Sequence, residues 1–237
     1  MKKASIWVGF DPREADGFAV TRDSIRRHLT RPIPVNGLVL SDMREKGLFW
    51  REQTRKDGVL WDVISDAPCA TEFSISRFLT PILAETGWAA FLDSDMMARA
   101  NFARLFDALD NSKALYCVHH NYQPTETVKM DGQVQTQYSR KNWSSVMIFN
   151  CDHPANNALT VDLVNTVPGR DLHRFCWIED DDLIGDLGPE WNWLVGHSDP
   201  AIDPKNVHFT TGLPSMQGYE DVPYSDEWWE ALHRWAR

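Results

Sequence analysis

The first 110 residues alternate between short apolar strand patterns and amphipathic helix patterns, and this alternation constrains the fold more than any other feature. The stretches SIWVGF (5–10), VNGLVLS (35–41) and WAAFLDSD (88–95) read as strands. Over 15–29 and 71–86, apolar residues recur at three- and four-residue steps, which predicts helices. Strands that alternate with helices predict an α/β protein with a mostly parallel central sheet flanked by helices.

The second half of the chain gives a less regular pattern. A helix is expected after Asn101, which is a suitable N-cap, and another over 158–167. Strands are expected over 114–120, 145–151 and 206–211. The segment SDEWWEALHRWAR (225–237) begins with acids and ends with basic residues, which matches the dipole of a helix. The stretches 42–70 and 121–144 give no clear pattern.

Charge and cysteine content narrow the classes of function. The balance of 24 basic against 34 acidic residues gives a formal net charge of −10, which argues against binding nucleic acid. The four cysteines are scattered without a CxxC pair, as is typical of free thiols in a reducing compartment. No apolar run approaches the length of a transmembrane helix, and Asp11 comes too early for a signal peptide. We therefore expect a cytoplasmic protein.

Two acids, Asp93 and Asp95, directly follow the buried strand pattern WAAFL. Side chains two positions apart in an extended chain project to the same side. Two carboxylates in this arrangement can bind a hard divalent ion and leave coordination positions for phosphate oxygens. The alternative is two solvated acids at the start of a loop. Asp11 also ends a strand, and the carboxyl ends of parallel strands share one crevice, so we expect all three acids there.

The order and spacing of six segments resemble glycosyltransferase family 8 and related nucleotide-sugar transferases of the GT-A fold. The segments are IWVGFD, SISRFLTPIL, WAAFLDSDMMARANFARLFD, NWSSVMIFNC, WIEDDDLIGDLGPEWNWL and VHFTTGLP. The resemblance implies a single GT-A-like domain over 1–237, with a nucleotide-binding half (1–110) and a half for sugar and acceptor (111–237). It also implies a metal-dependent, retaining transfer of a sugar from a nucleotide diphosphate, expected to be UDP, to an acceptor hydroxyl. The acceptor would be a glycan, a lipid-linked molecule or a small molecule.

The resemblance also assigns roles to residues. Asp93, Asp95 and His208 would be ligands of Mn²⁺ or Mg²⁺, and an imidazole ligand suits Mn²⁺ better. The acidic run resembles a family segment that contacts the donor sugar near the reacting carbon, and its register leaves Asp180, Asp181 and Asp182 as candidates. The donor-binding residues would be Gly9, Phe10, Asp11, Arg77, Asp93, Ser94, Asn142, Ser144 and Gly212.

Two further features of the resemblance concern the acceptor and the phosphates. Trp191 and Trp193 are expected on the acceptor side, because an aromatic ring packs against the C–H face of a sugar; the alternative is a place in the core. The family lysine that meets phosphate is not visible in HFTTGLPSM. The candidates to replace it are Lys129, Arg140, Lys141 and Lys205.

Two other functions remain compatible with the sequence. In a phosphatase of the haloacid-dehalogenase type, Asp93 would be the nucleophile and Asp95 the acid/base. In a non-catalytic module, the same site would only bind a nucleotide sugar or a glycan. The C-terminal helix is expected to dock on the same chain, and the alternative is that it lies on a membrane surface.

Overall fold

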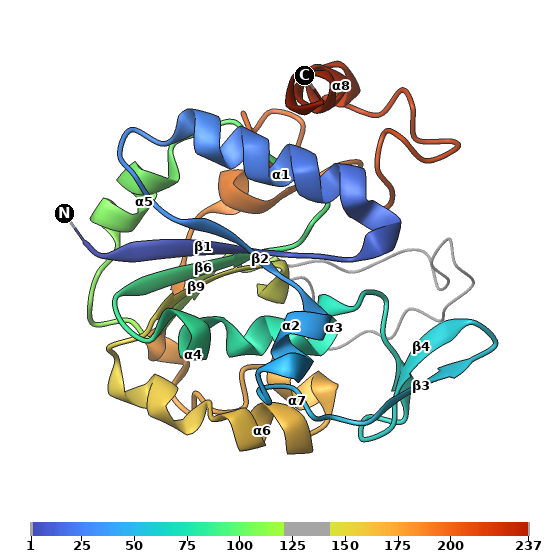
Figure 1. The fold of residues 1–237 in the computed structure, drawn as a ribbon. Coiled ribbons are helices and arrows are strands. Elements are labelled where there is room, and N and C mark those ends of the chain that lie inside the picture. Colours follow the sequence, from blue (N-terminus) through green and yellow to red (C-terminus); the bar gives the residue numbers. More distant parts are fainter. Residues whose placement is uncertain (1, 121–142, 237) are drawn as a thin grey trace.

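The computed structural model describes residues 2–120 and 143–236. Asn142, which the family resemblance assigns to the donor site, lies outside the described residues. A six-stranded sheet forms the centre, in the order β10-β8-β9-β6-β1-β2 (Figure 1). Its strands are β1 (Ala4–Gly9), β2 (Val35–Leu38), β6 (Trp88–Leu92), β8 (Leu115–Cys117), β9 (Val146–Asn150) and β10 (Ile184–Asp186).

The central sheet is mostly parallel, as the alternation of patterns predicts. β1 runs parallel to β2 and β6, and β8 runs parallel to β10. Only β9 runs antiparallel to its neighbours in this sheet, β6 and β8. The α/β fold class is therefore confirmed. The carboxyl ends of β1, β6, β8 and β10 consequently share one edge, and Asp93 and Asp95 follow β6 at that edge.

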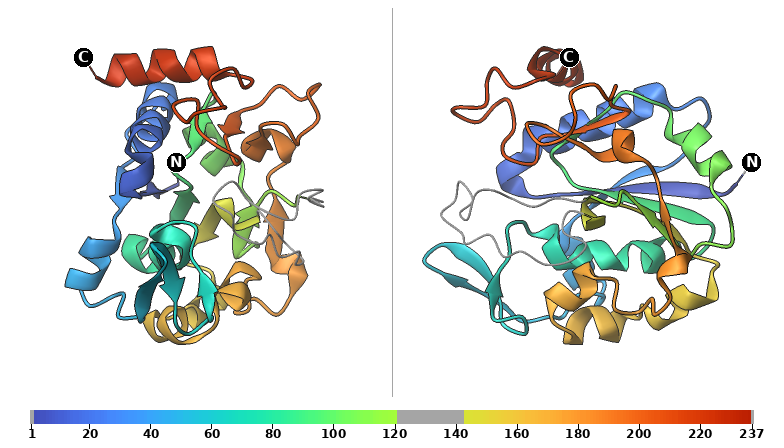
Figure 2. Two further views of the ribbon diagram at one scale, coloured as in Figure 1. Left: turned by 90° about the vertical axis from the view of Figure 1, so that its right-hand side faces the viewer. Right: turned by 180° about the vertical axis from the view of Figure 1, so that it is seen from behind.

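Helices cover both faces of the sheet (Figures 1 and 2). On one face lie α1 (Ala15–His28) and α5 (Phe102–Ala108); on the other lie α2 (Leu40–Glu45), α3 (Phe73–Ser76), α4 (Thr80–Ala84), α6 (Val161–Thr166) and α7 (Gly169–His173). A buried apolar cluster fills each interface, one centred on Phe73, Phe91 and Phe149 and the other on Ile6, Phe102 and Ile148. The expected helix over 71–86 is divided, because a 3-10 turn at Arg77–Leu79 separates α3 from α4. Pro81, which lacks an amide hydrogen, starts the second part.

A small second sheet positions a histidine beside the two strand-end acids. It consists of β7 (Met96–Ala98), β11 (Trp193–Leu194) and β12 (Asn206–His208), in the order β11-β12-β7. β12 pairs antiparallel with β7, and His208 is opposite Met96. The sequence pattern did not predict β7 or β11, because each has only two or three residues.

The hairpin β3 (Gln53–Lys56) to β4 (Val59–Asp62), with β5 (Ala67–Pro68), occupies the stretch that gave no clear pattern. Its turn is Asp57-Gly58, and both residues have positive φ, 51° and 83°. An Asp-Gly turn with this geometry matches the twist of a hairpin. The dipeptide was therefore a signal that the sequence analysis missed.

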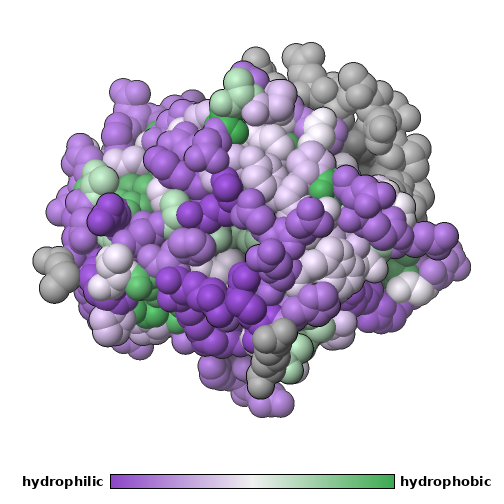
Figure 3. All heavy atoms as spheres, turned by 90° about the horizontal axis from the view of Figure 1, so that it is seen from above, coloured by the Kyte–Doolittle hydropathy of each residue, from purple (hydrophilic) through white to green (hydrophobic). Residues whose placement is uncertain are grey.

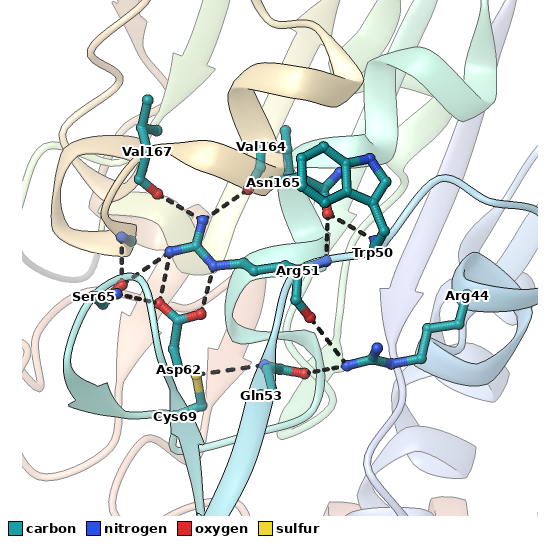
Figure 4. A network of polar contacts seen from close by, with 11 residues as sticks. Arg44, Trp50, Arg51, Gln53, Asp62, Ser65, Cys69, Val164, Asn165 and Val167 are labelled. Carbon is teal, nitrogen blue, oxygen red and sulfur yellow. Dashed lines mark hydrogen bonds and ion pairs between the residues drawn. The ribbon is translucent and has the colours of Figure 1, made fainter.

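A buried ion pair anchors this hairpin to α6 and α7 (Figure 4). Arg51 and Asp62 are 0% and 1% exposed and make two parallel contacts of 2.5 and 2.6 Å. The guanidinium also donates to the carbonyls of Val164 and Val167, at 3.0 and 2.6 Å. Asn165 accepts from the amide of Arg51. The charges are thus paired and hydrogen-bonded, which is the condition for tolerating a buried ion pair.

The C-terminal helix, α8 (Ser225–Trp235), packs on the outer side of α1, as expected for docking on the same chain (Figures 1 and 2). Trp228 and Ala231 are buried in a third apolar cluster with Val20 of α1, whereas Trp235 is 59% exposed. The face that carries α1 and α8 is mostly hydrophilic, with only scattered hydrophobic spots (Figure 3). Within the part of the chain that the structure describes, no helix has the length and apolar character needed to cross a membrane.

Candidate active site

Asp93 and Asp95, the two acids of the D-x-D segment Asp93-Ser94-Asp95, lie where the chain leaves the central sheet. Asp93 still donates its amide to the carbonyl of Ser145 in the neighbouring strand, at 3.0 Å. The carbonyl of Asp95 accepts from the amide of Phe209, at 2.9 Å, which ties the turn to β12. Thr21 of α1 places its hydroxyl 2.7 Å from the carbonyl of Ser94. The turn is therefore held from both sides, and the two carboxylates have a fixed backbone.

Asp93, Asp95 and His208 converge as the resemblance implies. One ligand atom from each lies within 4.8 Å of the other two. Nε2 of His208 lies 3.3 Å from Oδ1 of Asp95. Two carboxylates and an imidazole are suitable ligands for a divalent transition metal such as Mn²⁺.

The other ring nitrogen of His208, Nδ1, contacts Asn192, which directly precedes β11. Its Nδ1 lies 2.9 Å from Oδ1 of Asn192, whose amide nitrogen donates to the hydroxyl of Ser145 at 2.8 Å. An amide oxygen can only accept, so Nδ1 carries a proton and Nε2 is the nitrogen that faces the acids. This is the arrangement in which histidine ligates metals. The donor set therefore fits a divalent ion.

Arg77 lies under the D-x-D and is almost fully buried. Its Nη1 is 2.8 Å from Oδ1 of Asp93 and donates to the carbonyl of Ser144 at 2.9 Å. The guanidinium carbon also lies 4.9 Å from the ring centroid of Phe91, a cation–π contact. Arg77 thus compensates one carboxylate of the pair and fixes its orientation.

Burial and mutual charge set the ionisation of the site. Burial raises the pKa of Asp95, but the adjacent His208 lowers it by more, so the net shift is downward. Burial lowers the pKa of His208, but Asp95 raises it, and the net shift is upward. The pair thus favours a carboxylate beside an imidazole with increased proton affinity. A metal ion would compete with that proton for Nε2.

Glu14 is a fourth acid at this site, and the sequence analysis did not identify it. It lies in the turn that leads into α1 and accepts a hydrogen bond from the hydroxyl of Ser94, at 2.5 Å. Burial raises its pKa to about 7, and the charge of Asp95 contributes to the shift. A strongly shifted carboxyl group next to other acids is common at functional sites. No local sequence pattern distinguishes Glu14 from a solvated residue in the first turn of a helix.

The residues expected to cradle the nucleoside lie at the end of β1. A Cβ atom on Gly9 would lie 2.4 Å from the ring of Phe73, so only glycine fits there. Asp11 is 1% exposed. It accepts from the amides of Arg13 and Glu72, at 2.9 and 3.0 Å. Burial raises the pKa of Asp11, but hydrogen bonds from the side chain of Arg13 and from the amides of Arg13 and Glu72 lower it below its usual value. Asp11 is therefore an ionised residue that organises the loop.

Phe10, Ser144 and Gly212 complete the described residues of the expected donor site. The ring of Phe10 packs edge-on against Phe18, with centroids 5.0 Å apart. The hydroxyl of Ser144 lies 2.7 Å from Nδ1 of His173, and its carbonyl meets Arg77. Gly212 lies against Tyr219, whose ring a Cβ would approach to 2.7 Å. These residues are therefore engaged with neighbours in the protein.

Asp180, Asp181 and Asp182 are not brought to the D-x-D. The carbonyl of Leu183, next in the chain, accepts from the amide of Ala114. Ala114 in turn accepts from the amide of Asn150, which is paired with Trp88 at the amino end of β6. Leu183 is therefore level with the amino end of β6, whereas Asp93 follows the carboxyl end of β6. All three acids are exposed. The structure thus corrects the expectation that they lie near the reacting carbon, because the acidic run precedes β10 and enters the sheet from the opposite edge.

Asp186 is the acid that β10 places at the same edge of the sheet as Asp93. It is the last residue of that strand, and its Oδ1 accepts from the amide of His119 at 3.3 Å. The sequence contained this signal, since Asp186 directly follows the apolar pair Ile184-Gly185, just as Asp93 directly follows the apolar residues of β6.

Trp191 and Trp193 are core residues. They are 6% and 4% exposed, and Trp191 packs edge-on against Phe102 at 5.1 Å between centroids. Trp193 packs against Tyr224 and donates its indole N–H to the carbonyl of Asp199 at 3.0 Å. Neither ring presents a face to a ligand, so the expected acceptor platform is corrected. Burial of two large aromatic surfaces outweighs exposure for a sugar contact.

Of the four candidates to replace the family lysine, the structure describes Lys205 alone. Lys205 is on the surface, where it pairs with Glu190 at 3.1 Å and lies over the ring of Trp191. Lys129, Arg140 and Lys141 lie outside the described residues.

Comparisons with known proteins support the fold. No family model matches the chain. It is 42% identical over 242 residues to Protein CDI of Arabidopsis thaliana, in a match that covers 100% of this chain and 88% of that protein. The bifunctional glycosyltransferase WbbM superposes with a TM-score of 0.61 at 16% identity, over 98% of this chain and 50% of WbbM. This chain thus spans half the length of WbbM.

A second solved structure matches over nearly its whole length. The galactosyltransferase LgtC, in complex with donor and acceptor sugar analogues, superposes with a TM-score of 0.60 at 13% identity. The match covers 97% of this chain and 95% of LgtC. These likenesses confirm the expected α/β fold of the GT-A type.

Proposed function

We propose that this chain, which belongs to the family of the Arabidopsis thaliana Protein CDI, is a metal-dependent glycosyltransferase. It would transfer a sugar from a nucleotide diphosphate donor, UDP by preference, to an acceptor hydroxyl with retention of configuration. The observation that carries this proposal is the convergence of Asp93, Asp95 and His208 at the carboxyl edge of a GT-A sheet. The nucleotide would occupy the edge formed by the first half of the chain, beside Gly9 and Asp11.

The arrangement of charges supports this chemistry. A divalent ion bound by the three ligands would neutralise charge that develops on the diphosphate leaving group. Arg77 holds Asp93, so one carboxylate keeps its orientation whether or not the donor is present. Asn192 keeps the proton on Nδ1 of His208 and leaves Nε2 free for ligation. No acid of the run 180–182 lies near enough to act as a nucleophile, which supports a same-face reaction in which the leaving phosphate accepts the acceptor's proton.

The two alternative functions predict different outcomes. The GT-A fold favours sugar transfer over a phosphatase of the haloacid-dehalogenase type. The missing family lysine is the observation that favours a non-catalytic module, which would bind UDP without turnover.

A thermal-shift screen of nucleotides and UDP-sugars tests the proposal. We expect UDP or a UDP-sugar to raise the melting temperature of the wild type only when Mn²⁺ is present, and Asp95→Ala to abolish that shift. The matched control is Asp181→Ala, an exposed acid outside the site, which should behave like the wild type. Absence of any Mn²⁺-dependent nucleotide shift in the wild type would contradict the proposal.

A further inference from the structure

A cavity lies at the same edge of the sheet, beyond the proposed metal ligands Asp93, Asp95 and His208. Its volume is about 300 Å³, within the range of sites for small ligands. The ends of β8 and β10 supply His119, His120 and Asp186, and the loop after β11 supplies Ser198 and Asp199. The cavity therefore has polar walls from segments far apart in the sequence.

The cavity shares a wall with the metal ligands. Leu194 lines it and is paired with His208 across β11 and β12. The amide of Val195 also donates to the carbonyl of His208 at 3.0 Å. His120 is close enough for the charge of His208 to lower its pKa. A ligand in the cavity would thus lie next to the site proposed for the diphosphate.

Hydrogen bonds and ring stacking with neighbouring residues fix the positions of several residues that line the cavity. The indole N–H of Trp193 donates to the carbonyl of Asp199 at 3.0 Å, and the hydroxyl of Ser198 accepts from the amide of Leu194 at 2.8 Å. The ring of His119 stacks on that of Trp143, with centroids 4.1 Å apart and planes at 4°. The cavity is therefore preformed, as small-ligand sites usually are.

The polar groups of the walls select for an uncharged ligand. The Nε2 atom of His120 is buried and has no hydrogen-bond partner among the residues that the structure describes. Burial, followed by the charge of His208, lowers the pKa of His120 to about 4, so the ring is neutral at pH 7 and can exchange one hydrogen bond with a hydroxyl. Asp186 and Asp199 would accept from further hydroxyls and repel an anion.

The cavity is not arranged as a metal site. Among residues 2–120 and 143–236, the only group of three or more potential ligands at ligating distances is Asp93, Asp95 and His208. The histidines of the cavity wall do not belong to such a group.

We propose that this cavity is the acceptor subsite and that the acceptor presents an uncharged, hydroxyl-rich group such as a sugar ring. The inference rests on the proposed glycosyltransferase function. It places the acceptor beside His120 and Asp186 and not against Trp191 and Trp193.

Ligand-observed NMR tests this proposal with a mixture of neutral methyl glycosides (glucoside, galactoside, mannoside and xyloside) and with methyl glucuronoside as the anionic probe. The samples are wild type, His120→Ala and His120→Gln in the presence of UDP and Mg²⁺, because Mg²⁺ is diamagnetic and does not broaden the ligand signals as Mn²⁺ would. We expect saturation transfer to a neutral glycoside but not to the glucuronoside. His120→Ala should weaken that binding about tenfold, the effect of one lost hydrogen bond, and His120→Gln should restore much of it. The control is His233→Ala, an exposed histidine on α8, which should match the wild type.

A parallel titration of each protein with UDP and Mn²⁺ tests the proposed nucleotide site separately from the acceptor subsite. UDP binding without glycoside binding, or glycoside binding unchanged in His120→Ala, would overturn the acceptor subsite and leave the proposed function intact. Absence of UDP binding in the wild type would overturn the proposed function, and the subsite with it.

Discussion

The Nδ1 atom of His208 lies 2.9 Å from the amide oxygen of Asn192, and this contact fixes which nitrogen of the imidazole faces the two acids. Replacement of Asn192 by Leu removes the acceptor and allows the proton to occupy Nε2. We expect Mn²⁺ affinity to fall about 10–100-fold, the usual effect of losing such a partner. Isothermal titration with Mn²⁺ measures the affinity, and the ¹⁵N shifts of His208 in the metal-free protein report the tautomer.

Two variants control this prediction. Asn192→Asp retains an acceptor for Nδ1 and should keep most of the affinity. Asn206→Leu removes another buried amide of the small sheet, which contacts Trp191 and not His208, and should leave Mn²⁺ binding unchanged. Equal loss in Asn192→Leu and Asn206→Leu would mean that Asn192 acts only through stability.

Glu14 predicts a pH dependence of stability. Its pKa in the folded state is raised to about 7 from its ordinary value of 4.5, so between these two pH values the folded state holds a proton that the unfolded state has lost. The contribution of Glu14 to the free energy of unfolding is therefore greatest below about pH 4.5 and is lost as the pH rises toward 7. Glu14→Gln should flatten this decline in urea unfolding of the metal-free protein. The same slope in both proteins would refute the shift.

The ion pair between Arg51 and Asp62 predicts a strong coupling in stability. Arg51→Met leaves the carboxylate of Asp62 buried without its partner and should lower the free energy of unfolding by about 3–5 kcal/mol. The double variant Arg51→Met/Asp62→Leu should recover most of that loss, because no charge stays buried. Denaturant unfolding of the two single variants and the double variant measures the coupling. Additive effects would contradict it.

Two tryptophans of α8 form a matched pair. Trp228 is 0% exposed in the cluster with α1, whereas Trp235 is 59% exposed. Trp228→Ala should lower the free energy of unfolding by about 3–5 kcal/mol, and Trp235→Ala by less than about 0.5 kcal/mol.

Liposome pelleting of Trp235→Ala addresses the membrane alternative, since loss of pelleting relative to wild type would support surface binding through this helix.

The sequence predicted the parts of the site that lie on long, regular elements. Asp93 and Asp95 follow a strand of five buried residues, so their place was foreseeable. Arg77 lies within an expected helix, but its role at the site came from the family resemblance. His208 was assigned only through the family resemblance, because a three-residue strand carries too little periodicity to predict its pairing with β7.

Other parts depended on tertiary contacts that no local pattern encodes. Asp180–182 form a conspicuous run, yet the direction of β10 decides which edge they reach. Trp191 and Trp193 suit either a sugar platform or a core, and only packing against Phe102 and Tyr224 distinguishes them. Asn192, between two tryptophans, was a detectable signal, since a polar side chain within an apolar stretch requires a partner when it is buried.

The most direct test of the central claim is the Mn²⁺-dependent release of UDP from a panel of UDP-sugars by wild type and Asp95→Asn. Asparagine keeps the shape of the side chain and removes the charge that the metal requires. We predict release of UDP by the wild type with at least one donor, its loss when Mn²⁺ is chelated, and a fall of at least about 100-fold in Asp95→Asn, the scale of removing one group that stabilises developing charge. Turnover that is equal in the two proteins, or that survives chelation, would contradict a metal-dependent glycosyltransferase.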